Sequence, residues 1–92
     1  MNEDELVMVV EIAYNMFSDG TGLSDVAEAI RDRFEMTPSE VARTLSECGF
    51  EAEDVARALY RGLHLSRREV ALALVSGSLL TAAEADSAMH TL

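Results

Sequence analysis

The sequence contains no lysine and no tryptophan, and it has a single cysteine and a single proline. One cysteine excludes an internal disulfide, so we expect the chain to come from a reducing compartment. No apolar run approaches the ~18 residues that a transmembrane helix needs. The acidic N-terminal segment also lacks the basic residues that open a secretory signal peptide. Together these absences predict a cytoplasmic protein.

The charge of the chain is one-sided and unevenly spread. It has 17 acidic and 7 basic residues, which gives a net charge of −10. Residues 1–30 hold seven acids and no base, whereas all seven arginines lie within residues 31–68. Phosphates of nucleic acids and anionic lipids repel such a chain, so we predict neither direct nucleic acid binding nor membrane binding. Apolar residues make up 49%, enough for one folded domain over residues 1–92.

A helix-start motif recurs along the chain. Its best copy is the segment 36–41, in which Thr37 and Glu40 have the spacing of a capping box and Pro38 falls at the first helical position. The corresponding cap positions are 22, 37, 51, 66 and 81, which are 15, 14, 15 and 15 residues apart. Apolar residues with helical spacing follow each cap, so a helix is predicted after each of them.

These signals predict an all-α fold, a compact bundle of six short helices. The glycines Gly49, Gly62 and Gly77 fall where a left-handed residue commonly ends a helix, and we expect that conformation at each. Helices of about ten residues are unstable alone in water, so they must bury their apolar faces against one another. The predicted helices span residues 2–17, 23–35, 38–48, 52–61, 67–76 and 82–91.

A longer period is also visible. Residues 25–45 align without a gap with residues 54–74, and eight positions are identical. We interpret this as a duplicated helical hairpin of 29 residues, closed at its two ends by the first and last helices. The alternative is that two unrelated segments use the same favourable helix starts.

The sequence gives little indication of catalysis. His64 and His90 do not have the spacing of metal ligands, either with Cys48 or with each other. Several carboxylates are explained as helix caps. We therefore predict a protein that is not an enzyme and that uses no cofactor or metal.

Basic residues gather in the middle of this acidic chain. Arg67 and Arg68 fall in the first turn of a predicted helix, where cations oppose the helix dipole. Arg57 and Arg61 lie one turn apart, and His64 follows them. We predict a basic patch that contacts an acidic partner, including the acidic N-terminal helix of a second copy. The alternative is a solvated turn whose arginines pair with nearby acids.

Two further features point to an interface. The helix predicted at 67–76 is apolar nearly all round, because Leu72 and Val75 add to its apolar stripe. Such a helix is either central in the bundle or covered by a partner. Tyr60 and Tyr14 fall outside the apolar stripes and are candidate interface anchors.

An apolar pattern surrounds a Gly-Phe pair in residues 39–77. It consists of Leu45, Gly49, Phe50, Val55, Ala58, Leu59, Val70, Ala71 and Leu74. The pattern resembles the ubiquitin-associated domain, a three-helix module with a Gly-Phe loop after its first helix, although Cys48 stands where that family usually has methionine. The resemblance implies that Gly49 and Phe50 contact a partner. Otherwise Gly49 ends a helix and Phe50 packs against the next one.

The function that these patterns favour is a small non-enzymatic protein–protein interaction module, either an adaptor or a self-assembling unit that forms a homo-oligomer. An alternative function is an acidic inhibitor that imitates nucleic acid and occupies a basic groove of a target protein. Its surrogate phosphates would be Glu3, Asp4, Glu5 and Glu11.

Overall fold

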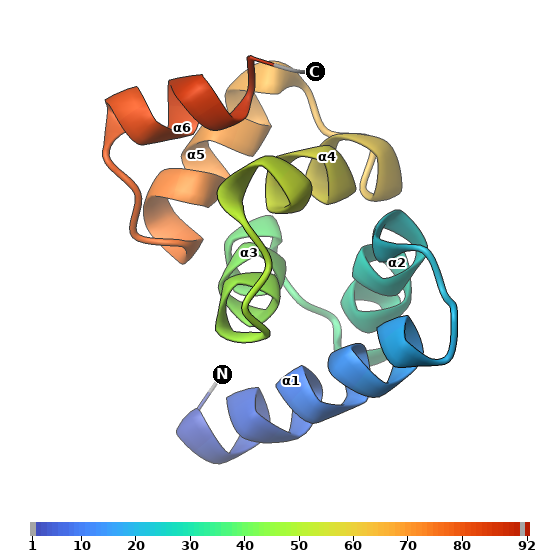
Figure 1. Ribbon diagram of the computed structural model, residues 1–92. Coiled ribbons are helices and arrows are strands. Elements are labelled where there is room, and N and C mark those ends of the chain that lie inside the picture. Colours follow the sequence, from blue (N-terminus) through green and yellow to red (C-terminus); the bar gives the residue numbers. More distant parts are fainter. Residues whose placement is uncertain (1, 91) are drawn as a thin grey trace.

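Six helices form a compact globule in the computed structural model, which describes residues 2–90 and 92 (Figure 1). No strand occurs among these residues, so the predicted all-α class is confirmed. The last helix ends at Ala88 instead of continuing as predicted, and position 91 of that prediction lies outside the described residues. None of the described helices is long and apolar enough to cross a membrane. The helices are α1 (Glu3–Ser18), α2 (Leu23–Phe34), α3 (Pro38–Glu47), α4 (Ala52–Gly62), α5 (Arg67–Gly77) and α6 (Ala82–Ala88).

The predicted caps are the observed N-caps of α2 to α6. Helices α3, α5 and α6 begin with complete capping boxes. In the first of these, the Glu40 amide donates to the Thr37 hydroxyl at 3.2 Å, and the Thr37 amide donates to the Glu40 carboxylate at 2.9 Å. The caps of α2 and α4, Gly22 and Glu51, make no side-chain hydrogen bond to their helices. Three of the five starts are therefore fixed by reciprocal hydrogen bonds.

The capping carboxylate of Glu40 makes part of the stability of α3 depend on pH. The hydrogen bond from the Thr37 amide holds the pKa of Glu40 below its ordinary value, and partial desolvation opposes this only in part. Because folding lowers the pKa of Glu40, its charged carboxylate stabilises the folded chain. This stabilisation is complete above the unfolded pKa, about 4.3, and is lost as the pH falls through the folded pKa.

Glu40→Gln should therefore destabilise the chain at neutral pH, and the difference from the wild type should shrink as the pH falls below about 4. The measurement is the free energy of unfolding of both proteins in urea along a pH series. All other carboxylates titrate in both proteins, so their effects cancel in the difference. A difference that stays constant down to low pH would show that the Glu40 carboxylate does not act in its charged form.

The connections between helices share one backbone geometry. Each has a residue with positive φ two positions before the next N-cap, and the five φ values lie between 51° and 102°. This repeats the period of the caps in the backbone itself. The five residues are Gly20, Glu35, Gly49, His64 and Leu79.

Gly62 and Gly77 do not have the left-handed conformation that the sequence predicts, so that prediction is wrong for both; it holds for Gly49, with φ 95°. Both are buried at the last residue of their helices. A Cβ atom on Gly62 would lie 2.2 Å from the carbonyl oxygen of Ser24, and one on Gly77 would lie 2.1 Å from that of Ser39. Here the missing side chain permits close helix packing, of α4 on α2 and of α5 on α3.

The helices follow a simple contact rule. Among the described residues, each helix contacts the next helix and the one after it, and contacts none farther along. The pairs α2–α4 and α3–α5 have the most extensive contacts. The arrangement is thus a short array in which the single helix is the repeating unit. The predicted duplication of a 29-residue hairpin is not established by this rule and stays a prediction.

The core lies along the inner sides of α2 to α5. Among the described residues, Thr44 is the polar residue that is fully buried, and its hydroxyl donates to the carbonyl oxygen of Glu40 at 2.9 Å. A polar contact also ties α3 to the end of α5, because the Ser46 and Ser78 hydroxyls are hydrogen-bonded at 2.7 Å. The large side chains that are completely enclosed are Ile30, Leu45, Leu59, Leu74, Val9, Val26, Val41, Val55 and Val70.

Candidate protein-binding site

An apolar groove with a basic end lies between α5 and α6. Its volume is about 700 Å³. Figure 1 shows these two helices side by side at the end of the molecule opposite α1, and neither of them contacts α1. The groove, which we call the α5/α6 groove, is lined by Arg67, Arg68, Ala71, Leu72, Val75, Ala82, Ala85, Asp86, Met89 and His90.

Helix α5 packs on one side only. It buries Val70, Ala73 and Leu74, whereas Leu72 is 59% exposed and Val75 is 40% exposed. The interpretation that this helix is central in the bundle is therefore wrong for its outer face. Because α5 is apolar nearly all round, its outer face exposes apolar surface to water in the isolated chain. This exposure costs about 25 cal/mol of free energy for each Å² of apolar surface.

The exposed face of α5 corresponds to a face that is covered elsewhere in the fold. The second, fifth and ninth residues after the N-cap of α3 are Ser39, Ala42 and Ser46, and all three lie against the end of α5. Counted in the same way from Ser66, these positions of α5 are Arg68, Ala71 and Val75. Arg68 and Val75 are exposed, and Ala71 is half-buried. The α5/α6 groove is thus equivalent to a site that a helix occupies on α3.

The predicted basic patch is assembled in large part. Four of its five members line an open depression around the connection from α4 to α5, together with Tyr60: Arg61, His64, Arg67 and Arg68. The last two also line the α5/α6 groove, so the depression and the groove adjoin. The Arg67 guanidinium donates to the carbonyl oxygen of Leu92. Arg57 is not part of this surface, because it pairs with Asp54 at 2.9 Å.

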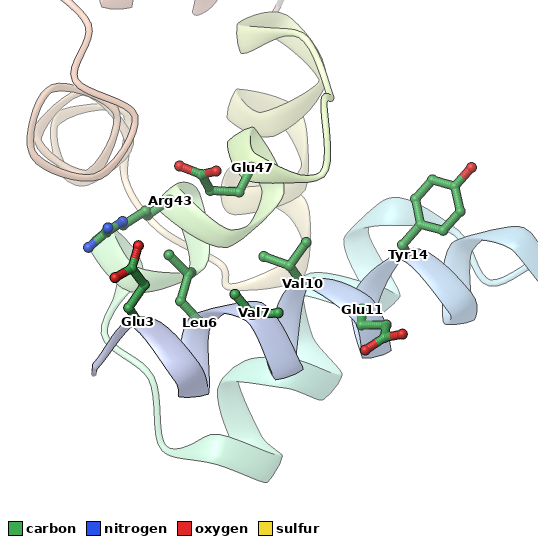
Figure 2. Close-up of a pocket in the computed structure, with 8 residues that line it drawn as sticks. All are labelled: Glu3, Leu6, Val7, Val10, Glu11, Tyr14, Arg43 and Glu47. Atoms are coloured by element: carbon green, nitrogen blue, oxygen red, sulfur yellow. The ribbon is translucent and has the colours of Figure 1, made fainter.

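A second groove lies between α1 and α3, with a volume of about 630 Å³. Figure 2 shows Glu3 and Arg43 at one end of it and Tyr14 at the other. Glu11 lines it as well, whereas Asp4 and Glu5 are exposed elsewhere in the first turn of α1. The complete lining is Glu3, Leu6, Val7, Val10, Glu11, Tyr14, Arg43 and Glu47.

Sequence reasoning missed Val7, which is 60% exposed on α1. The signal was present in the run of five apolar residues at 6–10, because consecutive residues cannot all lie on one face of a helix. Tyr14, seven residues later, is on the same side and 55% exposed. Together they form an exposed apolar stripe along α1.

The Gly-Phe loop is partly used inside the fold. Gly49 is exposed, but the half-buried ring of Phe50 packs edge to face on Phe17, with 4.8 Å between the ring centroids. Cys48 precedes this loop, and its thiol lies 3.5 Å from the carbonyl oxygen of Val10. Burial, and secondarily the charge of Glu47, raises the pKa of this thiol. Cys48 is therefore a neutral packing residue at neutral pH.

The chemistry that these surfaces offer is association. The α5/α6 groove presents apolar walls beside two guanidinium groups, a pattern that suits an amphipathic helix with acidic flanks. Within the described residues, no three His, Cys, Asp or Glu side chains come together as a metal site. Comparisons with protein-family models, with curated proteins and with solved structures found no match to this chain.

Proposed function

We propose that this chain is a non-enzymatic protein–protein interaction module that binds a helix of its partner in the α5/α6 groove. The observation that carries the proposal is the exposure of Val75, whose counterpart Ser46 on α3 lies against the end of α5, together with the exposure of Leu72 beside it in the lining of the groove. A helix laid in such a groove buries its apolar residues at i, i+3, i+4 and i+7. The adjoining arginines, Arg67 and Arg68, favour acidic residues on its flanks.

The test uses helical peptides selected from a displayed library against the wild-type chain. We expect amphipathic, acidic sequences whose affinity falls at least about tenfold on Leu72→Glu, because the substitution places a charge in the apolar wall. The matched control is Leu79→Glu, the same chemical change at a leucine that is 85% exposed and lies outside the groove. That variant should bind the peptides as the wild type does. Peptides that bind both variants equally well would contradict the proposal.

The acidic inhibitor is the second candidate function. It is favoured by four exposed carboxylates on one helix, those of Glu3, Asp4, Glu5 and Glu11. The neighbouring groove has an apolar lining with Val7 at its rim. This lining favours contact with an apolar surface of a partner protein over contact with a groove that binds phosphate groups. The same selection separates the two functions, since an inhibitor of this kind would select basic peptides that are insensitive to Leu72→Glu and that dissociate steeply as salt is added.

A further inference from the structure

We infer that the helix bound in the α5/α6 groove is α1 of a second copy of this chain, so that the chains join head to tail. The inference rests on the proposed function, because it names the occupant of the same groove. Three properties support it. The groove and α1 carry opposite charges, both have exposed apolar side chains, and the two surfaces lie on different helices of one chain.

The charges are complementary. The acceptor side carries Arg67 and Arg68 in the groove and Arg61 in the adjoining depression. Arg67 and Arg68 are in the first turn of α5, so the cations of the groove are concentrated there. Asp86 and His90 also line the groove. The donor helix α1 carries three acids in its first turn and Glu11 farther along, with no base in its last turn. An α1 helix therefore brings carboxylates to the place where α5 presents guanidinium groups.

The apolar surfaces are also matched in kind. Val7 and Tyr14 are more than half exposed and lie two helical turns apart on the side of α1 that lines the groove beside α3. Leu72 and Val75 form the corresponding exposed surface of the groove. Docking would remove all four from water, and a tyrosine beside aliphatic residues is a common centre of protein interfaces. All four side chains are exposed in the isolated chain.

The two surfaces lie on different parts of the chain, which fixes the type of assembly. Helix α1 contacts only α2 and α3, so the donor and the acceptor of one molecule do not meet each other. Each copy keeps a free acceptor after its α1 has docked, and the interface is heterologous. Such contacts generate closed rings, the smallest of which is a reciprocal pair, or open filaments.

The net charge of −10 opposes association at long range. At physiological ionic strength the screening length is about 8 Å, which weakens this repulsion while adjacent charge pairs persist. The assembly is therefore measured near that ionic strength. We expect the mean mass of the wild type to rise above 10.0 kDa as its concentration increases.

Two complementary variants test the inference. Leu72→Glu blocks the acceptor and leaves α1 intact, whereas Val7→Glu blocks the donor and leaves the groove intact. Each variant alone should stay at 10.0 kDa in sedimentation or light scattering. An equimolar mixture should form a one-to-one complex of twice that mass and nothing larger, because it contains one functional donor and one functional acceptor. Leu79→Glu should assemble as the wild type does.

A second pair of variants gives an independent answer if either substitution disturbs folding, as judged by circular dichroism. Arg67→Glu with Arg68→Glu reverses the acceptor charges, and Glu3→Arg with Glu11→Arg reverses those of the donor. Each double variant should lose self-association, and mixing the two should restore the complex between them. Charge reversal on both sides then restores attraction with unchanged apolar contacts.

Three results would overturn the inference: a wild type that stays monomeric up to about 1 mM, mixtures that form no complex, or single variants that still dimerise. Its failure is distinguishable from failure of the proposed function. Selected peptides that depend on Leu72, together with a monomeric wild type, would keep the groove as a binding site for another protein. Peptides that ignore Leu72→Glu would remove the groove itself as the site.

Discussion

Gly77→Ala is expected to destabilise the chain by about 3 kcal/mol, the upper end of the cost of overpacking a well-packed interior. The new methyl group would lie 2.1 Å from the carbonyl oxygen of Ser39, and backbone cannot move aside as a flexible side chain does. Helix α5 would have to separate from α3, with which it shares the most extensive contacts of the fold. In a chain of this size the midpoint of thermal unfolding should fall by about 15 °C.

The direction of this effect is opposite to the usual one. Glycine to alanine in an exposed helix stabilises by up to about 1 kcal/mol, because alanine loses less backbone entropy. Gly62→Ala should behave like Gly77→Ala, since its methyl group would meet the carbonyl oxygen of Ser24 at 2.2 Å. The control is Gly22→Ala, whose methyl group meets only the Asp25 carboxylate at 3.7 Å and whose cost should stay below about 1 kcal/mol. A Gly77→Ala variant as stable as this control would show that α3 and α5 do not approach so closely.

The fold was largely predictable because its signals are local. Capping pairs such as Thr37 and Glu40 mark helix starts through contacts three residues apart, and the apolar period marks the buried faces. The role of the residues that end each helix depends on contacts that are more distant in the sequence. Gly62 and Gly77 look like helix-ending residues, but their role is set by Ser24 and Ser39, far away in the sequence. The left-handed positions were taken instead by His64 and Leu79 in the same connections.

The candidate site was predictable in its composition and less so in its extent. The arginines around the connection from α4 to α5 are close in sequence, so most of the basic patch could be predicted from the sequence alone. Arg57 does not belong to this patch in the structure, because its guanidinium pairs with Asp54, three residues earlier. The groove beside it depends on which side of α5 packs against α3. That choice is made by tertiary contacts, and the apolarity of α5 alone does not reveal it.

Leu45→Ala is expected to lower the free energy of unfolding by about 3 kcal/mol, within the range for leucines deleted from protein cores. Leu45 is fully enclosed in α3, and this helix contacts α1, α2, α4 and α5. Because α3 is held by four other helices, it is not free to shift and close the cavity. The chain has no tryptophan, so urea unfolding is followed by far-ultraviolet circular dichroism.

The same experiment tests whether the array unfolds as one unit. Helices that contact only near neighbours can unfold in stages, but α3 and α4 each contact four of the other five helices and thereby couple the two ends. We therefore expect Leu45→Ala to move a single transition to lower urea without splitting it. Leu79→Ala, at a leucine that is 85% exposed, should change the free energy of unfolding by less than about 0.5 kcal/mol. A split transition would mean that α5 and α6 stay folded after α3 is lost, and the groove between them would then be an independent unit.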